Sequence, residues 1–438
     1  IANLRGYSRE MSRAASPRKV KTLPTAIVPA ASAEIVTVLA SGEGILPQRR
    51  RSTKPTHKER LVAVLGSLLG EGTQVAELNF TTALAARSSA TLRALAADLE
   101  CYSGFCLDHP RPGLPASPER LTGYIGHLEA RRQSPATISR KVASLGAVHR
   151  ILDLPSATAA PLVRDALRGM RKRQGVAQRQ AGPLRFGAEI GREPAKGLTL
   201  TALLDACGGD PPGLRDAALL SLGYDAGLRV SELVAATCES VQLQDDGSGL
   251  LHIERSKTDQ LGEGSYVWVS PDTMRRIALW RDVSAISAGP LFCRIAVRRR
   301  KVVLARRALT MADLAPNAKV DRERMAAVQA RDPGVTYAIG SAALTPTAVR
   351  HIIKRRARAA ADAGLVTLMG KKLDRAIAAL STHSLRVGLT QDLFASGADA
   401  GPVAQALRWT STSTALRYGR KLAPASNAAA AMLGKVRR

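Results

Sequence analysis

The chain has 438 residues, of which 64 are lysine or arginine and 36 are acidic, so its formal net charge is +28. This length favours two domains and a tail, and a hydrophobic share of 45% is enough to bury a core in each. Aromatic residues make up only 3% and alanine is frequent, which argues against a β-rich fold and favours helices. The charge indicates a polyanionic partner, most often nucleic acid, although a ribosome-associated or membrane-surface protein would also be basic.

Cysteines and apolar stretches exclude several other classes of protein. The five cysteines include no Cys-x-x-Cys pair and have no histidine cluster nearby, which argues against a disulfide framework or a zinc site and favours a reducing compartment. The longest apolar stretches, near residues 25–45 and 61–69, are too short or carry a glutamate, so we expect no membrane span and no membrane partner. We see no signal peptide, although the chain begins at Ile1.

Residues 1–74 are predicted to form a basic, flexible N-terminal extension. The segment is rich in Arg, Lys, Ser, Pro and Ala, with three consecutive arginines at 49–51. A segment of this composition is typical of disorder rather than of a packed core. It either adds affinity for DNA or has no role, and the sequence does not decide between the two.

Residues 75–180 are predicted to be an all-α domain with a basic surface. Apolar residues recur there at three- and four-residue spacing, and caps or first-turn prolines mark helix starts at Ser88, Ser117, Ser134 and Pro161. The helix after Ser134 is predicted to turn four side chains inward, those of Ile138, Val142, Leu145 and Val148. Arg140 and Lys141 would then fall on its outer side.

A basic linker with glycines and prolines is predicted at 181–197, before a second domain at 198–438. This domain opens with helices predicted near 200–206, 213–224 and 229–236. Its one convincing β region follows, because residues 241–243, 250–255 and 266–269 alternate or carry β-branched side chains and are separated by turns. After Pro271 the pattern is again helical, down to a short tail helix over 428–433 with Ser426 and Asn427 at its start.

The segment 296–341 departs from this pattern and is predicted to be an insertion in the second domain. It begins with the basic run at 298–301 and continues with an Ala/Arg/Asp pattern that is typical of a helix. It either lies on DNA or is a solvated helix without a role, and no feature of the sequence favours one over the other.

Four short strings carry chemistry through their order and spacing. Arg229 lies in Gly-Leu-Arg-Val-Ser-Glu-Leu, Lys257 lies in the predicted hairpin, His383 begins His-Ser-Leu-Arg, and Trp409 is followed nine residues later by Tyr418. Taken singly, each has an ordinary interpretation: a surface Arg–Glu pair, a solvated lysine, a capping or core histidine, a core tryptophan and a half-buried tyrosine. Their chance assembly in this order, in a chain of charge +28, is improbable.

Together these residues resemble the catalytic set of the tyrosine recombinase/integrase family, and most closely its Cre-like branch: Arg229, Lys257, His383, Arg386, Trp409 and Tyr418. Trp409 stands where most members have His and the Cre-like branch has Trp. Upstream, residues 88–181 resemble the family's core-binding domain, whereas the first 75 residues and 296–341 lie outside the likeness. Two features depart from the family pattern: Arg408 stands where Gly is usual, and the stretch between Lys257 and His383 is longer than usual.

The resemblance implies a mainly α fold of two domains that close as a clamp around duplex DNA. The first would be an all-α core-binding domain, and the second an α+β, integrase-type catalytic domain whose small antiparallel sheet carries Lys257. Arg93 and Arg140 align with DNA-facing positions of the family, and Lys141 lies beside Arg140. A solvated basic face is the alternative explanation for these three residues.

The resemblance also implies a role for each residue at the phosphate. Tyr418 attacks a DNA phosphodiester and becomes covalently joined to it. Arg229 and Arg386 donate forked hydrogen bonds to the phosphate oxygens and stay charged while doing so. Trp409 offers one indole N–H donor and packing that keeps the site dry.

Proton transfer would involve two further residues. His383 accepts or steers the proton of the nucleophile, and Lys257 gives a proton to the leaving 5′-oxygen. Glu232 lies on the same helical face as Arg229 and either orients a member of the cluster or has a structural role only. Because the covalent link stores the bond energy, we expect no ATP, no metal and no other cofactor, and the sequence contains no Walker motif.

The expected partner is double-stranded DNA with an inverted-repeat target site. The resemblance implies that a homotetramer assembles on this DNA, exchanges strands through a Holliday junction, and docks each tail helix into a neighbouring copy. An accessory DNA-bending protein is an optional further partner. The expected location is the cytoplasm, at the nucleoid, in a bacterial or phage-like setting.

Two other functions stay open. A type IB topoisomerase-like or telomere-resolving enzyme would use the same Arg/Lys/His/Tyr chemistry, and strand exchange between two DNA molecules would distinguish a recombinase from it. A catalytically silent architectural protein would bind DNA in a salt-sensitive way and form no covalent adduct. The complete catalytic set argues against this second alternative.

Overall fold

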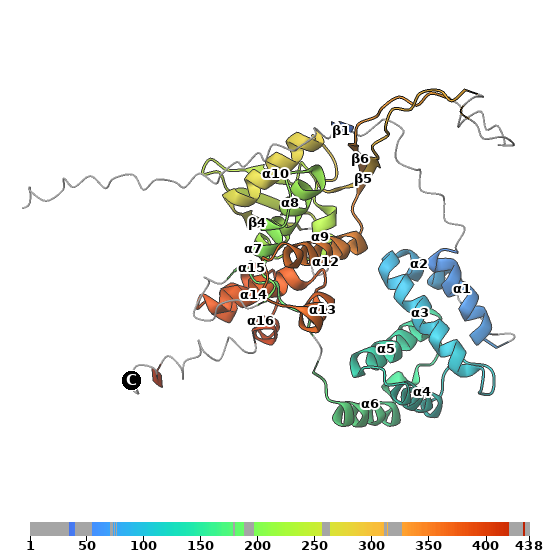
Figure 1. Ribbon diagram of the computed structural model, residues 1–438. Helices are drawn as coiled ribbons and strands as arrows, with labels where there is room; N and C mark the ends of the chain where they lie inside the picture. The colour runs from blue at the N-terminus through green and yellow to red at the C-terminus, as the bar shows by residue number, and fades with distance from the viewer. Residues whose placement is uncertain are drawn as a thin grey trace, which may run out of the picture. The chain divides into compact units, whose positions relative to one another are not determined.

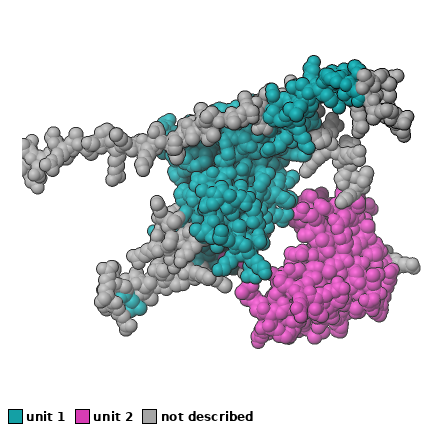
Figure 2. All heavy atoms as spheres, viewed as in Figure 1, with its two compact units in different colours: residues 1–46, 183–438 teal, residues 47–182 magenta. Residues whose placement is uncertain are grey.

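The computed structural model describes residues 35–39, 55–70, 73, 75, 77–177, 180–187, 197–255, 263–310, 313, 326–419 and 432–433. The chain divides into two compact units, one formed by Pro47–Gly182 and the other by Ile1–Leu46 together with Pro183–Arg438 (Figure 2). We call them the helical unit and the mixed unit.

The helical unit is built from helices α1 His57–Leu68, α2 Glu77–Ala85, α3 Ser89–Cys106, α4 Pro118–Ala130, α5 Pro135–Ile151 and α6 Pro161–Gln174, with a short 3-10 helix at Ala157–Ala159 (Figure 1). The predicted helix starts are confirmed. Ser88, Ser117 and Ser134 each accept a hydrogen bond from the backbone N–H three residues further on, and Pro161 opens α6. The core includes Tyr102 and Tyr124, whose fully buried rings pack edge to face with centroids 5.0 Å apart.

The helical unit begins earlier than the sequence analysis placed it. α1 lies within the predicted flexible extension, yet it packs against α3 and buries Leu61, Val64, Leu65 and Leu68. Thr56 Oγ1 accepts from the Glu59 N–H at 3.2 Å, and Glu59 Oε2 accepts from the Thr56 N–H at 2.8 Å. This capping box ahead of an apolar run was a local helix signal that the basic composition obscured. The prediction of a flexible extension is therefore wrong over α1.

α5 corrects the predicted position of one basic side chain. Lys141 is only 8% exposed, whereas Arg140 is exposed. Lys141 lies three residues after Ile138 and four before Leu145, and both of these side chains are fully buried. This spacing puts Lys141 on the inner face of the helix, so the expectation that it lies on the outer side is wrong.

The mixed unit packs helices around α8 Pro211–Asp225, which is buried along most of its length. The predicted neighbours of α8 are present as α7 Leu200–Asp205 and α9 Val230–Ala235. Further helices are α10 Pro271–Ser284, α12 Pro346–Asp362, α13 Gly370–Ala379, α14 Ser384–Ala395, α15 Ala400–Ala406 and α16 Thr412–Tyr418. Leu219 of α8, Trp280 of α10 and Ile353 of α12 are fully buried in one continuous core.

A small antiparallel sheet has the order β2 Val241–Leu243, β3 Gly249–Ile253 and β4 Ser265–Val269. Leu251 of β3 pairs with Val241 on one side and with Val267 on the other. The predicted antiparallel sheet is therefore confirmed. Lys257 comes between β3 and β4 in the sequence and lies outside the described residues.

A second sheet was not predicted. Its central strand is β6 Gly334–Ala343, which pairs antiparallel with β5 Cys293–Arg300 and parallel with β1 Ile35–Leu39. The helical pattern inferred for 296–341 is therefore wrong over its described strands, and β1 places part of the predicted extension in a sheet. The β-branched residues of β6 were the signal for a strand, and the arginine- and alanine-rich sequence around them obscured it.

The predicted linker 181–197 packs in part into the mixed unit. Leu184 is fully buried, and its N–H donates to the carbonyl of Ser384 at 3.0 Å. Asp392 of α14 accepts from Arg185 Nε at 2.5 Å and from the Phe186 N–H at 2.7 Å. The start of the predicted linker is thus tied to α14, while residues 188–196 lie outside the described residues.

The predicted fold class is confirmed: over the described residues the chain is mainly α, and its mixed unit is α+β with small sheets. The predicted tail helix at 428–433 falls outside the described residues except for Met432 and Leu433, which are helical. Within the described ranges, no helix combines the length and the apolar character needed to cross a membrane.

Candidate active site

Tyr418 and His383 meet at the ends of two helices. Tyr418 is the last residue of α16, and His383 is the N-cap residue of α14. His383 Nε2 lies 2.9 Å from Tyr418 Oη, which is a hydrogen-bond distance. The next residue, Gly419, has no room for a side chain, because a Cβ there would lie 2.4 Å from Phe394 Cδ2 of α14. The close approach of the two helices therefore holds the phenol beside the imidazole.

Trp409 contacts both the tyrosine and a buried arginine. Its ring stacks on that of Tyr418, with centroids 5.2 Å apart and planes 7° from parallel. The Cζ atom of Arg386 lies 5.0 Å from the centre of the Trp409 ring, which is a cation–π distance. Trp409 therefore links the tyrosine to the cationic part of the site.

Arg386 is 1% exposed and lies in the first turn of α14. Its two terminal nitrogens donate to the carbonyls of Gly227 and Leu407. Its Nε is buried and has no hydrogen-bond partner. Among the described residues it forms no ion pair with a carboxylate, so the charge of this guanidinium is left for an anion to balance.

The two carbonyls that hold Arg386 belong to the C-terminal turns of α8 and α15. Gly227 ends the first turn with a φ of 52°, and Arg408 ends the second with a φ of 53°. In each turn the following N–H bonds back into the helix, at 3.2 Å after Gly227 and at 2.8 Å after Arg408, as in a Schellman motif. A Cβ at position 227 would lie 2.4 Å from Leu407 Cδ2, so the approach of the two turns requires glycine there.

Glu232 joins two arginines at the start of α9. Its Oε1 accepts from Arg229 Nη1 at 2.9 Å, and its Oε2 accepts from the Arg229 N–H at 2.9 Å. The same Oε2 accepts from Arg408 Nη2 at 2.9 Å. Sequence reasoning did not include Arg408 in the site. Its only signal was that it replaces the glycine usual in the family pattern.

The cluster shifts the pKa values of its members. Burial, and then the charges of Arg386 and Arg229, lower the pKa of His383 to about 4. Burial and the charges of Arg229 and Arg408 lower the pKa of Arg386 to about 9. Burial raises the pKa of Glu232, but hydrogen bonds from Arg229 and the charge of Arg408 outweigh it and hold that pKa below its usual range. At neutral pH the site therefore combines a neutral imidazole with charged guanidiniums.

The structure brings most of the predicted catalytic set into one cluster, namely Arg229, His383, Arg386, Trp409 and Tyr418, with Glu232 bound to Arg229. Lys257 lies outside the described residues. These side chains come from α9, α14 and α16 and from the turn after α15, so the site is assembled from segments far apart in the sequence.

The predicted DNA-facing residues lie in the helical unit. Arg93 is exposed on α3. The Arg140 side chain is half exposed and forms an ion pair with Asp98, a carboxylate only 2% exposed that also accepts from Ser144 Oγ at 2.7 Å. Arg140 therefore has a structural partner in the core, Lys141 is buried, and DNA contact by any of the three stays a prediction.

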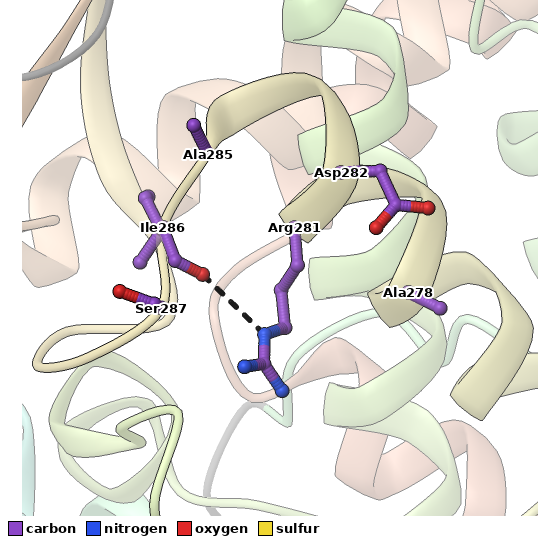
Figure 3. A pocket seen from close by; sticks show the side chains of 6 residues that line it. All are labelled: Ala278, Arg281, Asp282, Ala285, Ile286 and Ser287. Carbon is purple, nitrogen blue, oxygen red and sulfur yellow. Dashed lines mark hydrogen bonds between the residues drawn. The ribbon is translucent and has the colours of Figure 1, made fainter.

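The described residues contain no group of three or more His, Cys, Asp or Glu side chains placed to bind a metal ion. A surface hollow of about 390 Å³ lies at the end of α10, lined by Ala278, Arg281, Asp282, Ala285, Ile286 and Ser287 (Figure 3). Its guanidinium, that of Arg281, donates from Nε to the carbonyl of Ile286 at 3.4 Å and so braces the turn after the helix. None of the clustered residues lines this hollow, so the candidate site is the Tyr418 cluster.

Comparison with curated proteins finds recombinases. The chain is 31% identical over 212 residues to an integrase/recombinase XerD homolog of Selenomonas ruminantium, which covers 46% of this chain and 58% of that protein. It is 24% identical over 340 residues to the recombinase Cre of Escherichia phage P1, which covers 76% of this chain and 85% of Cre. The match thus spans little more than half the length of the first relative and most of the second. No protein-family model matches the chain.

Solved structures with some likeness to the chain include the XerH site-specific recombinase bound to palindromic difH substrate, at 13% identity, a TM-score of 0.47, and coverage of 88% of this chain and 98% of that chain. They also include the Tn1549 transposon integrase in complex with circular intermediate DNA, at 12% identity, a TM-score of 0.44, and coverage of 83% and 100%. Likeness at this level adds nothing to the assignment, which depends on the curated relatives and the motifs. Both relatives are recombinases of the kind that the motifs resemble, so the chain is similar to tyrosine recombinases over long stretches of sequence as well as in its motifs.

Proposed function

We propose that the chain is a site-specific DNA recombinase that cleaves and rejoins DNA strands through a 3′-phosphotyrosyl intermediate. The observation that carries the proposal is the 2.9 Å contact between Tyr418 Oη and Nε2 of His383, whose pKa is lowered to about 4. A neutral imidazole at this distance is a base that can take the proton of the phenol. The phenolate oxygen is then a nucleophile held next to two arginines.

In the cleavage step, Tyr418 Oη attacks the phosphorus of a DNA phosphodiester. Its proton passes to His383 Nε2, a bond from phosphorus to Tyr418 Oη forms, and the bond from phosphorus to the 5′-oxygen breaks. Lys257, as predicted from the sequence, supplies the proton that the leaving 5′-oxygen needs. The products are a 3′-phosphotyrosyl link and a free 5′-hydroxyl.

Arg386 and Arg229 would stabilise the charge that develops on the non-bridging phosphate oxygens. Arg386 is held by two carbonyls and has a buried Nε without a partner. Arg229 uses Nη1 on Glu232 and is 18% exposed, which leaves its other nitrogens for a phosphate. Preorganised donors of this type contribute about 3 kcal/mol each in a transition state.

Rejoining reverses the chemistry with a 5′-hydroxyl from another strand, and the phosphotyrosyl bond supplies the energy. We propose that the chain does this on duplex DNA with an inverted-repeat site, as a homotetramer that passes through a Holliday junction. An accessory DNA-bending protein and a cytoplasmic, nucleoid-associated location belong to the same proposal. Support comes from the family, since the match to Cre covers 85% of that recombinase.

Covalent capture tests the proposal. Fragments of the source genome are incubated with the full chain, the mixture is denatured with detergent, and DNA that remains attached to protein is recovered and sequenced. We expect adducts that cluster at an inverted repeat and disappear in Tyr418→Phe. Because this variant keeps the ring, it also keeps the stack on Trp409 and separates loss of the nucleophile from loss of the fold.

The same experiment distinguishes the alternatives. Adducts whose only product is relaxed circular DNA, with no exchange between two molecules, would indicate a topoisomerase-like enzyme. DNA binding without any adduct would indicate an architectural protein and would refute the proposal.

A further inference from the structure

Arg408 occupies a backbone position that disfavours a side chain. Its φ is 53°, and the left-handed conformation costs a residue other than glycine on the order of 1 kcal/mol or more. Glycine is the usual residue at this point of a Schellman turn, and Gly227 does occupy the matching position in the turn after α8. A side chain kept here at such a cost is expected to make an interaction that compensates for it.

The Arg408 side chain connects the turn after α15 to the turn after α8 and to α9. Nη2 donates to Glu232 Oε2 at 2.9 Å, and Nη1 donates to the carbonyl of Ala226 at 3.2 Å. The side chain is 13% exposed, and its Nε is buried without a hydrogen-bond partner. The chain therefore places a third guanidinium in the cluster, close enough for its charge to lower the pKa of Arg386.

The charge balance of the cluster shows what Arg408 changes. If Arg229 were the only partner of Glu232, the two would form a one-to-one ion pair, and the carboxylate would cancel the charge that Arg229 offers to a phosphate. With Arg408 present, one carboxylate is shared between two guanidiniums, so these three side chains keep a net positive charge. The 2% exposure of the Glu232 side chain leaves little solvent to screen these interactions.

We propose that Arg408 is a positioning residue of this site, one that takes up part of the Glu232 carboxylate so that Arg229 keeps charge and donors for the phosphate. The role rests on the proposed phosphate chemistry, and it does not require that Arg408 touch DNA. It differs from a purely structural role in one respect: removal of Glu232 should compensate for removal of Arg408.

Orthovanadate, which adopts the five-coordinate geometry of a phosphate under attack, tests this role without knowledge of the DNA site. Binding to the full chain is followed through the histidine Cε1–H signals in NMR, and His383→Gln identifies the signal of His383. We expect Arg408→Gly to weaken orthovanadate binding about 10-fold, which is the effect of roughly 1.4 kcal/mol. Arg408→Lys, which keeps the charge and loses the fork, should lie between this variant and the wild type.

The double variant Arg408→Gly/Glu232→Gln decides the mechanism. It restores the net charge around Arg229, so we expect it to recover most of the lost affinity. Affinity that is unchanged in Arg408→Gly, or equally weak in the single and double variants, would overturn the positioning role. Failure of the wild type to bind orthovanadate near His383 would instead refute the proposed phosphate site, and with it the basis of this role.

A different part of the mixed unit carries a second inference. β5 and β6 pair along their length, with β1 on the other edge of β6 over Gly334–Ala338, and past Arg300 they continue as a two-stranded ribbon through isolated bridges from Val303 to Arg331 and from Arg306 to Val328. Figure 1 shows the paired strands leaving the body of the mixed unit side by side. At about 3.3 Å per residue, the ribbon from Cys293 to Arg306 is on the order of 40 Å long.

The ribbon is anchored at its base and basic along its length. Cys293 and Ile339 are each 2% exposed at the base, whereas Arg299, Arg300 and Lys301 are exposed further along. The described positions from 294 to 333 carry eight basic residues and only two acidic ones. Past Arg300 the described residues pair as two strands only, and such a ribbon is marginally stable in water, so a partner that covers it would also stabilise it.

We propose that this ribbon binds duplex DNA. The major groove admits a two-stranded ribbon, and exposed arginines along it can bond to phosphates. This contact would add to the one made at the cleavage site and would hold whether or not Tyr418 is active. A protein partner is the competing occupant, and the dependence of DNA binding on salt separates the two.

The test uses a generic 40-base-pair duplex and the full chain, with affinity measured over a range of salt concentrations. Each phosphate contact contributes about 0.9 to the slope of log affinity against log salt, so Arg299→Gln/Arg300→Gln should lower the slope by about 2. The matched control is Arg275→Gln/Arg276→Gln on α10, which removes the same charge from a surface helix and should leave the slope nearly unchanged. Equal slopes for the two variants would overturn the ribbon proposal. Tyr418→Phe should show the wild-type slope in the same assay, because DNA binding by the ribbon does not require the proposed nucleophile.

Discussion

Trp409 and Tyr418 stack with nearly parallel rings, whose planes are 7° apart and whose centroids are separated by 5.2 Å. The stack fixes the plane of the phenol, while the 2.9 Å contact with His383 Nε2 fixes the position of its Oη. Trp409 also lies within cation–π distance of Arg386, so one ring orients the phenol and borders the cationic cluster. The position of the Tyr418 phenol thus depends on packing as well as on hydrogen bonding.

Truncation of Trp409 tests the importance of this stack. We expect Trp409→Phe to slow formation of the covalent adduct by less than about 10-fold, and Trp409→Ala by about 30-fold, since stacking and cation–π terms of roughly 1 kcal/mol each are then lost. The measurement is the initial rate of adduct formation on the captured DNA, read from a denaturing gel. If Trp409→Phe were as slow as Trp409→Ala, the indole N–H rather than the stack would carry the effect.

The lowered pKa of His383 predicts the pH dependence of cleavage. Burial and then the charges of Arg386 and Arg229 hold this pKa at about 4, so the imidazole stays neutral well below pH 6.5. We expect adduct formation to remain level from pH 8 down to about pH 5, where a histidine with the ordinary pKa of about 6.5 would already be protonated. A rate that falls with a midpoint near pH 6.5 would contradict the lowered pKa of His383.

The same shift predicts a pH effect on stability. Between the folded pKa of about 4 and the ordinary value of 6.5, the unfolded chain binds more protons at this residue than the folded chain does. The free energy of unfolding therefore rises with pH in this window, and the contribution of His383 is lost as the pH falls through it. Urea unfolding at pH 7 and pH 5 should show a larger loss for the wild type than for His383→Gln. An equal loss in both proteins would contradict the lowered pKa.

Local signals were sufficient for much of the fold and for the members of the site. Ser88, Ser117 and Ser134 act through backbone groups three residues away, so the sequence alone locates their helices. Order and spacing in the sequence predicted that Tyr418 and His383 share a site, and in the structure the two side chains lie within hydrogen-bond distance. The strands β5 and β6 were missed, since their pairing joins segments about 40 residues apart and their basic composition hides the β pattern.

The contact between Arg408 and Glu232 is a part of the site that the sequence could not predict. Its partner Glu232 lies 176 residues earlier in the sequence, and the contact exists only because two helix-ending turns meet across Arg386. The substitution was visible in the sequence as a departure from the family pattern. Its consequence depends on a positive φ and on a shared carboxylate, and neither can be read from residue type.

Gly388, in the middle of α14, lies against the backbone of Leu184, at the start of the mixed unit. The same helix carries Arg386. A Cβ at position 388 would lie 1.8 Å from the backbone carbonyl oxygen of Leu184, which cannot move without breaking the ties of Arg185 to Asp392. We expect Gly388→Ala to lower the free energy of unfolding by about 3 kcal/mol, as overpacking against backbone does. Gly401→Ala on α15 is the control, since a Cβ there meets nothing within 4 Å. Equal stability of the two variants would contradict this close contact.

Lys257 can be tested through the leaving group, although it lies outside the described residues. If its ammonium protonates the 5′-oxygen, Lys257→Ala should slow adduct formation on ordinary DNA by about 100-fold or more. DNA in which sulfur replaces the bridging 5′-oxygen releases a thiolate, which leaves without a proton. On this substrate Lys257→Ala should recover to within about 10-fold of the wild type, because the step that needs the acid has been removed.

Arg229→Ala is the matched control variant for the experiment with sulfur-substituted DNA. Arg229 is proposed to act on the non-bridging oxygens, which the sulfur substrate leaves unchanged, so its defect should persist on both DNAs. Recovery of Lys257→Ala alone would assign the proton to the hairpin lysine and the charge stabilisation to the Arg229–Glu232–Arg408 group. Recovery of both variants would mean that loss of the leaving group limits each of them, and recovery of neither would refute the role of Lys257 as general acid.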